Sequence, residues 1–322
     1  MFRLLSVFIL LLTLTPPVIA ASWHTVSPQV TLIAPQAKAR YILPNMALIK
    51  GKTCSALIDS HGDFVALEQL INQLKTRLTT PLCHLIATSS EPHQLTGLAL
   101  LKQAFPDASV HLPDAPQLTD HTMRTALDTQ LANFAKSIEL SEQRLSKLPA
   151  EQQAPWQKRV TLAKQRLTRW QTLHSIAVTN PAVQPRELKL GGLTLQLTQF
   201  QGQSGHDLSV FIAQHGALFA GHSANLLPYV RNTTWQRSLQ ALKNTPALNW
   251  VMPAFGKPYQ AEQLELPITF MDLAQQQLTR SNTQMPKRVV TLYQNQPYNE
   301  AQLAQHFTQA IKVLSHKKAL NK

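Results

Sequence analysis

The loop formed by residues 88–97 carries side chains that can take part in metal or acid–base chemistry. It follows an apolar run at residues 82–87 and precedes an amphipathic run at residues 95–105. Metallohydrolases place ligands in such loops between a strand and a helix. Glu91 and His93 are ligating residue types, because carboxylate and imidazole groups both bind zinc. The sequence therefore predicts a candidate site where this strand ends.

Four further short motifs lie near the ends of other apolar runs. They read Leu57-Ile-Asp-Ser-His-Gly, Gln203-Ser-Gly-His206, Leu218-Phe-Ala-Gly-His222 and Met252-Pro-Ala-Phe-Gly256. Together with the 88–97 loop they follow the order of five landmarks of the metallo-β-lactamase superfamily. The chain resembles that family over about residues 28–115 and 186–260. The resemblance implies an α/β fold, an αββα sandwich of the metallo-β-lactamase type.

The resemblance also places seven metal-ligand positions in these loops, and one of them keeps the family's residue type. The family's loop reads Thr-His-x-His-x-Asp-His-x-x-Gly. In this chain the seven positions hold Ser89, Glu91, His93, Gln94, His206, His222 and Phe255. His206 is the retained ligand, whereas Ser89, Gln94 and Phe255 replace histidines and are poor or impossible zinc ligands. Most of the chelating groups of a dinuclear site are therefore missing.

Four of these positions still hold residues that bind zinc. Glu91 replaces a histidine, and His93 and His222 each replace an aspartate, so with His206 they could complete one tetrahedral site. A site filled by four protein ligands would be structural, because a catalytic zinc keeps one position open for water. A lone loop histidine is more often a surface residue, but three at former ligand positions favour a site. The expected cofactor is either none or a single zinc ion.

Three residues of a neighbouring loop have supporting roles in this prediction. The resemblance implies that Asp59 orients a ligand rather than binding metal itself. His61 and Asp63 lie in the same loop, at the same expected edge of the sheet. These three residues form a second shell around the proposed ligands.

Two metal-free alternatives use the same loops. Ser89 or Ser90 near His206 would supply a nucleophile and a base. A small anion could instead bind the free backbone amides of the helix that begins near His93. The sequence fixes the geometry of neither arrangement.

Composition limits the class of partner. The chain has 322 residues with 44% hydrophobic and 15% charged residues, which is typical of a globular protein. Its net charge of +13 favours anionic partners, although many exported bacterial proteins are basic. No nucleic-acid motif is present, so no nucleic-acid partner is expected. The expected partner is an unidentified small-molecule or protein ligand.

The N-terminus has the pattern of a secretory signal peptide. Arg3 precedes an apolar stretch at residues 4–12 and a small-residue cleavage site at Ala20 or Ala21. The apolar stretch is shorter than the roughly 20 residues that a membrane span requires. We therefore predict a signal peptide at residues 1–21, no transmembrane span after its cleavage, and an exported, periplasmic protein.

The remaining pattern predicts one domain over residues 22–322. Apolar runs that suit strands alternate with amphipathic helices up to residue 112. Apolar residues at steps of three and four predict a helical hairpin inserted at about residues 118–178, with Pro149 and Pro155 in its turn. Further strand-like runs follow, and helices are expected at about residues 260–322.

The two cysteines, Cys54 and Cys83, each precede the end of a predicted strand by a few residues. The resemblance implies that these strands are parallel neighbours, which would place the thiols at a similar height. An oxidising compartment would permit a disulfide between them. Bridges between neighbouring parallel strands are geometrically demanding, so two buried free thiols are an equal alternative.

Two classes of function fit these patterns. The first is an exported binding module that kept the fold and lost its dinuclear metal site, an inactive relative of the hydrolases. The second is a hydrolase of an ester, amide or phosphoester that uses one metal ion and a non-standard ligand set. The loss of ligands at Ser89, Gln94 and Phe255 favours the first.

Overall fold

The computed structural model describes residues 21–35, 43–178, 187–280 and 283–320. Its strands form two six-stranded sheets. The first sheet has the order β1 (Ala21–Ser27), β2 (Val30–Pro35), β3 (Met46–Lys50), β4 (Ser55–Ile58), β5 (Leu82–Ile86) and β6 (Ser109–His111). The second has the order β12 (Tyr259–Gln260), β11 (Trp250–Met252), β10 (Ala217–Phe219), β9 (Asp207–Ile212), β8 (Thr194–Phe200) and β7 (Glu187–Lys189).

The strand directions bring several chain segments to one edge. Strands β4, β5 and β6 are parallel, with Ile58 opposite Ile86 and Ile86 opposite His111. In the second sheet, β10 and β11 are parallel, with Phe219 opposite Met252. The carboxyl ends of parallel neighbours lie at the same edge of a sheet. The loops that follow β4 and β5 therefore lie side by side at this edge.

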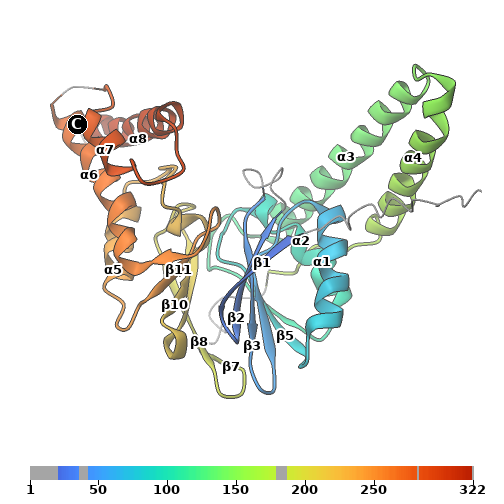
Figure 1. Cartoon of the computed structure of the whole chain (residues 1–322), viewed down its shortest axis with the longest axis horizontal. Coiled ribbons are helices and arrows are strands. Elements are labelled where there is room, and N and C mark those ends of the chain that lie inside the picture. The colour runs from blue at the N-terminus through green and yellow to red at the C-terminus, as the bar shows by residue number, and fades with distance from the viewer. Residues whose placement is uncertain (1–20, 36–42, 179–186, 281–282, 321–322) are drawn as a thin grey trace, which may run out of the picture.

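Helices cover the outer face of each sheet, and apolar side chains fill the space between the sheets. The helices are α1 (Phe64–Arg77), α2 (Gly97–Ala104), α3 (Asp120–Leu145), α4 (Ala150–Trp170), α5 (Trp235–Lys243), α6 (Glu265–Thr279), α7 (Lys287–Leu292) and α8 (Glu300–Leu320). The first sheet packs on α1 and α2, and the second on α5 and α6 (Figure 1). The inner faces meet through β-branched and aliphatic residues such as Val30, Ile49 and Val210. This is the αββα arrangement that the sequence predicted.

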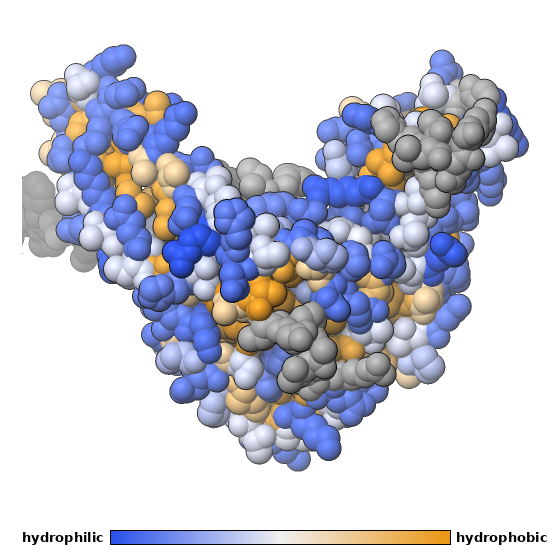
Figure 2. Space-filling view, turned by 180° about the vertical axis from the view of Figure 1, so that it is seen from behind, coloured by the Kyte–Doolittle hydropathy of each residue, from blue (hydrophilic) through white to orange (hydrophobic). Residues whose placement is uncertain are grey.

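Two arms rise from the sandwich, one beside each sheet (Figure 1). One is the pair α3 and α4, inserted between β6 and β7, and the other contains α6, α7 and α8. The space-filling view shows the molecular surface hollowed between the arms (Figure 2). Within the described ranges, no helix is both long and apolar enough to cross a membrane.

Some boundaries differ from the sequence prediction. Pro155 was expected in the turn of the hairpin, but it lies inside α4, whose N-cap is Pro149. A proline near a helix start removes one backbone donor, and packing along α3 offsets that loss. Strand β1 begins at Ala21, the last residue of the predicted signal peptide, and α7 was not foreseen. The strand-like run at residues 41–43 lies almost wholly outside the described residues, as does the signal peptide up to residue 20.

Candidate functional site

Asp59 holds the loop that follows β5. It comes directly after β4 and has a φ of 63°, a conformation that aspartate tolerates better than most residues. The backbone N–H of Thr88 donates to Asp59 Oδ1 at 2.7 Å, and Thr88 Oγ1 donates to Oδ2 at 2.7 Å. Burial raises the pKa of Asp59 to about 6, against the lowering effect of these bonds. The Asp59 carboxylate therefore fixes the position of the loop that follows β5.

Gly221, in the loop that follows β10 of the second sheet, packs directly against Thr88 and Asp59. Gly221 has a φ of 50°, and a Cβ atom there would lie 2.1 Å from Thr88 Oγ1. The backbone N–H of Leu208 also donates to the Thr88 carbonyl at 2.9 Å. Glycine is required at Gly221 by both the conformation and the close approach. Loops from both sheets therefore converge on Thr88.

Asp207 is the centre of a second cluster, at the start of β9. Its buried carboxylate accepts from the backbone N–H of Ser204 at 3.1 Å, from Ser204 Oγ, and from Ser223 Oγ at 2.6 Å. Ser223 Oγ in turn accepts from the backbone N–H of Gln203 at 2.6 Å. A Cβ atom on Gly202 would lie 2.1 Å from Asp207 Oδ2. Asp207 thus ties together the loops before β9 and after β10.

Serine hydroxyls extend this cluster to the 88–97 loop. Ser90 Oγ lies 2.9 Å from Ser204 Oγ, and the Ser90 backbone N–H donates to Ser204 Oγ at 3.2 Å. Gln117 Nε2 donates to Ser90 Oγ at 2.6 Å. Ser89 Oγ accepts from the backbone N–H of Glu91 at 3.2 Å. These hydroxyls hold the loop rather than facing an imidazole, so the serine nucleophile alternative gains no geometric support.

Glu91 is paired with a cation that the motifs did not indicate. Arg231 Nη1 donates to Glu91 Oε1 at 2.9 Å, and His93 Nδ1 lies 3.6 Å from Glu91 Oε2. Arg231 follows the loop after β10, in a stretch without any of the five motifs. The two oxygens of this carboxylate are therefore directed at a guanidinium and an imidazole.

His222 completes this group of residues. Burial, together with the charges of Arg231 and His93, lowers the pKa of His222 to about 4. Its ring makes an edge-to-face contact with Phe255, with centroids 5.1 Å apart. The backbone N–H of Phe255 donates to Asn225 Oδ1 at 3.0 Å, which fixes that loop. Two former ligand positions therefore meet, one as a neutral imidazole and the other as a phenyl ring.

The remaining predicted residues lie in the same group of loops. His206 precedes Asp207 in the loop that Ser204 and Asp207 hold. Asp63 Oδ1 accepts from the backbone N–H of Ala66 at 3.0 Å and caps α1. Burial lowers the pKa of His61 to about 4, and its Nδ1 is buried without a hydrogen-bond partner in the described part of the chain. Asp207 and Arg231 are the two charged residues of the site that the sequence analysis missed.

The residues present do not fit the family's pair of metal ions. Among the residues that the structure describes, no group of three or more His, Cys, Asp or Glu side chains is arranged to hold a metal ion. The guanidinium of Arg231 lies on the one carboxylate of the rewritten loop, and a cation there opposes a divalent ion. Phe255 offers no donor atom at all.

A recess opens between the 88–97 loop and α3, with a surface that is mostly carbon although many of its residues carry polar groups. Its volume is about 410 Å³, within the range of small-molecule sites. Donor-bearing side chains contribute much of its lining, namely His93, Thr96, His121, Thr122, Thr125, Thr129, Gln130 and Asn133. Pro92 and Ala126 are the other described residues of the lining, and none of those described is acidic. Thr96, Thr122, Thr129 and Gln130 already donate to backbone carbonyls, so a ligand with acceptor oxygens would be held by His93, His121, Thr125 and Asn133.

Comparison with solved structures identifies the fold. A beta-lactamase domain protein from Burkholderia ambifaria superposes with a TM-score of 0.55 at 14% identity, covering 96% of this chain and 91% of that one. Metallo-beta-lactamases from Pontibacter korlensis and Hirschia baltica, each 14% identical, give TM-scores of 0.47 and 0.45. Both matches cover 77% of this chain. They cover 97% of the Pontibacter korlensis protein and 96% of the Hirschia baltica protein. No family model and no curated sequence matches. The predicted metallo-β-lactamase fold, with α3 and α4 inserted, is confirmed.

Proposed function

We propose that this protein is an exported binding module built on the metallo-β-lactamase fold, a pseudoenzyme whose metal edge has become a hydrogen-bonded platform. The observation that carries the proposal is the ion pair between Arg231 and Glu91, with His222 neutral beside it. A hydrolytic metal centre needs ligands that are available to the metal and a water to activate. Here the carboxylate is engaged by a cation, and Asp207 is engaged by serine donors.

The recess beside His93 is the proposed ligand site. It lies next to the platform and offers imidazole, hydroxyl and amide groups. We expect a small molecule rich in carboxylate, phosphate or hydroxyl oxygens. Citrate is a suitable probe, because its carboxylates can accept from several of these donors. Titration calorimetry should detect citrate binding that weakens at least about tenfold in Thr125→Val, a change that removes a donor and keeps the shape.

Export is the second element of the proposal. The N-terminal pattern and a disulfide between Cys54 and Cys83 both suit an oxidising compartment. Fusion of the first 21 residues to a reporter that is active only after export would test it. A reporter that stays inside the cell would contradict this element alone.

Metal analysis tests the platform itself. Protein purified without added zinc should contain less than one equivalent of any divalent ion and should not hydrolyse β-lactam, thioester or phosphodiester substrates. The alternative is a hydrolase with one zinc held by His206, His222 and either Glu91 or His93, which leaves the fourth position to water, and the 3.6 Å separation of His93 and Glu91 favours it. Under that alternative, zinc would be bound, and His206→Ala and His222→Ala would each abolish binding, whereas Ser89→Ala would not. Zinc-dependent hydrolysis lost on chelation would overturn the proposal.

A further inference from the structure

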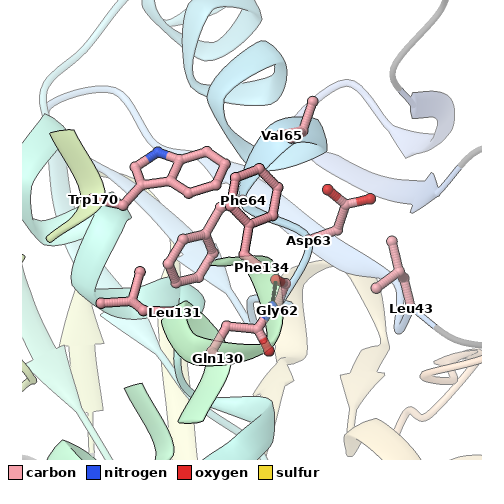
Figure 3. Close-up of a pocket in the computed structure, with 9 residues that line it drawn as sticks. All are labelled: Leu43, Gly62, Asp63, Phe64, Val65, Gln130, Leu131, Phe134 and Trp170. Carbon is pink, nitrogen blue, oxygen red and sulfur yellow. Dashed lines mark hydrogen bonds between the residues drawn. The ribbon is translucent and has the colours of Figure 1, made fainter. Parts of the chain in front are cut away.

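A second, largely apolar pocket lies at the base of the helical arm and shares Gln130 with the recess beside His93. Its volume is about 460 Å³, which suits a small molecule. Six apolar side chains line it, namely Leu43, Phe64, Val65, Leu131, Phe134 and Trp170. Figure 3 shows the three aromatic rings gathered together, with Leu43 and the Asp63 carboxylate on another side. The pocket thus has an aromatic wall and a single acidic group.

The aromatic wall is built from three helices and is held firmly. Phe64 of α1 and Phe134 of α3 both make edge-to-face contacts with Trp170 of α4, at centroid distances of 5.3 and 4.6 Å. Trp170 Nε1 donates to Glu68 Oε1 at 2.9 Å, so the polar edge of the indole is already satisfied. Arg166 also pairs with Glu68. Phe64 and Trp170 are 3% and 1% exposed, so the ring surface that this wall offers a ligand comes mainly from Phe134.

The polar groups of the pocket favour a cation over an anion. Among the residues that the structure describes, the lining includes one carboxylate, Asp63, and no lysine, arginine or histidine. Asp63 caps α1 through Oδ1, which accepts from one of the backbone N–H groups that would otherwise attract an anion to this helix end. Gln130 Nε2 is engaged by the Gly62 carbonyl at 2.5 Å, so it is not available as a donor to a carboxylate. Aromatic faces also attract ammonium groups.

We propose that this pocket binds an amphiphilic amine, a molecule with an apolar chain or ring that ends in an ammonium group. The apolar part lies against Val65, Leu131 and Phe134, which the buried Trp170 supports, and the ammonium group lies beside Asp63. The chain's net charge of +13 opposes such a ligand at long range. A preference for the cation would therefore come from the pocket itself rather than from the overall charge. This proposal does not depend on the function proposed for the recess beside His93.

Calorimetry with three ten-carbon probes tests the proposal on the full mature chain. Decylammonium, decanol and decanoate share an apolar chain and differ in the charge of the head group. We expect decylammonium to bind at least about tenfold more tightly than decanol, and decanoate to bind more weakly than either. Decanoate binding as tightly as decylammonium, or no binding by any probe, would overturn the proposal.

Two variants test which residues determine the affinity of the pocket for the three probes. Asp63→Asn removes the charge and keeps a residue that caps helices well, so the fold should be retained. It should reduce decylammonium affinity to about that of decanol and leave decanol binding unchanged. Asp128→Asn is the matched control, since Asp128 is exposed on α3 and does not line the pocket. Leu131→Trp should fill the pocket and weaken all three probes, and an unchanged selectivity in Asp63→Asn would exclude the assigned role of Asp63.

Discussion

Arg231 and Glu91 are 140 residues apart in the chain, yet their side chains are joined at 2.9 Å across the edge where the two sheets meet. The pair is partly exposed, so its contribution to stability is small. Its importance is chemical, because it places a permanent positive charge on the one carboxylate of the 88–97 loop. The same charge helps to keep His222 neutral.

Removal of that charge should make the site more receptive to zinc. In Arg231→Ala, Glu91 loses its cationic partner and the neighbouring imidazoles lose an electrostatic competitor of the metal. Calorimetric titration with zinc should show affinity at least about tenfold higher than in the unmodified protein, which corresponds to about 1.4 kcal/mol. Arg237→Ala is the control, since Arg237 is exposed on α5. Equal zinc affinity in Arg231→Ala and the unmodified protein would show that the guanidinium is not what excludes the metal.

Replacement of Asp207 should lower the free energy of unfolding more than replacement of a neighbouring residue on β9 does. Asp207→Ala leaves the backbone N–H of Ser204 and two serine hydroxyls without their acceptor in a buried place. Each unsatisfied buried donor costs about 1–3 kcal/mol, so we expect a loss of about 2–5 kcal/mol in the free energy of unfolding. Urea unfolding followed by circular dichroism would measure it. Ser209→Ala on the same strand, whose hydroxyl makes one bond at 3.3 Å, should cost less than about 1 kcal/mol.

The fold was readable from the sequence because its elements have strong local patterns. The apolar runs that became β4 and β5, and the steps of three and four in α3 and α4, depend on residues close in the chain. Pro155 was misplaced because proline was taken as a turn signal, although a helix can absorb one near its start. Strand β12 and helix α7 are short, and such elements leave little periodicity to detect.

The site was only partly readable, for a different reason. The loops that carry Glu91, His93, His206 and His222 could be found from their motifs. Arg231 belongs to no motif, and its partner depends on how the two sheets pack. Asp207 adjoins His206, which was a usable signal, but its role depends on the close approach of Gly202. Contacts of this kind leave no pattern in a single sequence.

Because its pKa is raised, Asp59 should make the stability of the folded protein fall as pH rises. Its folded value of about 6 lies above the unfolded value of 3.8, so between these values the folded protein binds more protons than the unfolded protein. The contribution of Asp59 to stability therefore falls as pH rises from about 4 to 6, by at most about 3 kcal/mol. Asp59→Asn removes this change, and asparagine tolerates the positive φ.

The measurement is the difference in unfolding free energy between Asp59→Asn and the unmodified protein at several pH values. The difference should move in favour of the variant from pH 4 to 6 and then level off. A difference between proteins is needed because His61, His111 and His222 have lowered pKa values and contribute an opposite slope. A difference that does not change with pH would contradict the assigned environment of Asp59.

The disulfide resolves an alternative that the sequence left open. Ser55 is opposite Leu82 and Ala56 is opposite His84, so Cys83 is the extra residue of an irregular pairing between β4 and β5. This places the Cα atoms of Cys54 and Cys83 5.8 Å apart, within the range that a bridge requires. The bridge spans a separation of 29 residues and should stabilise the fold by about 2–4 kcal/mol. Reduction should lower the free energy of unfolding by that amount, and a variant with Cys54→Ala and Cys83→Ala should not respond to reductant. Thiol titration of the denatured, unreduced protein should find no free thiol, and two free thiols would refute the bridge.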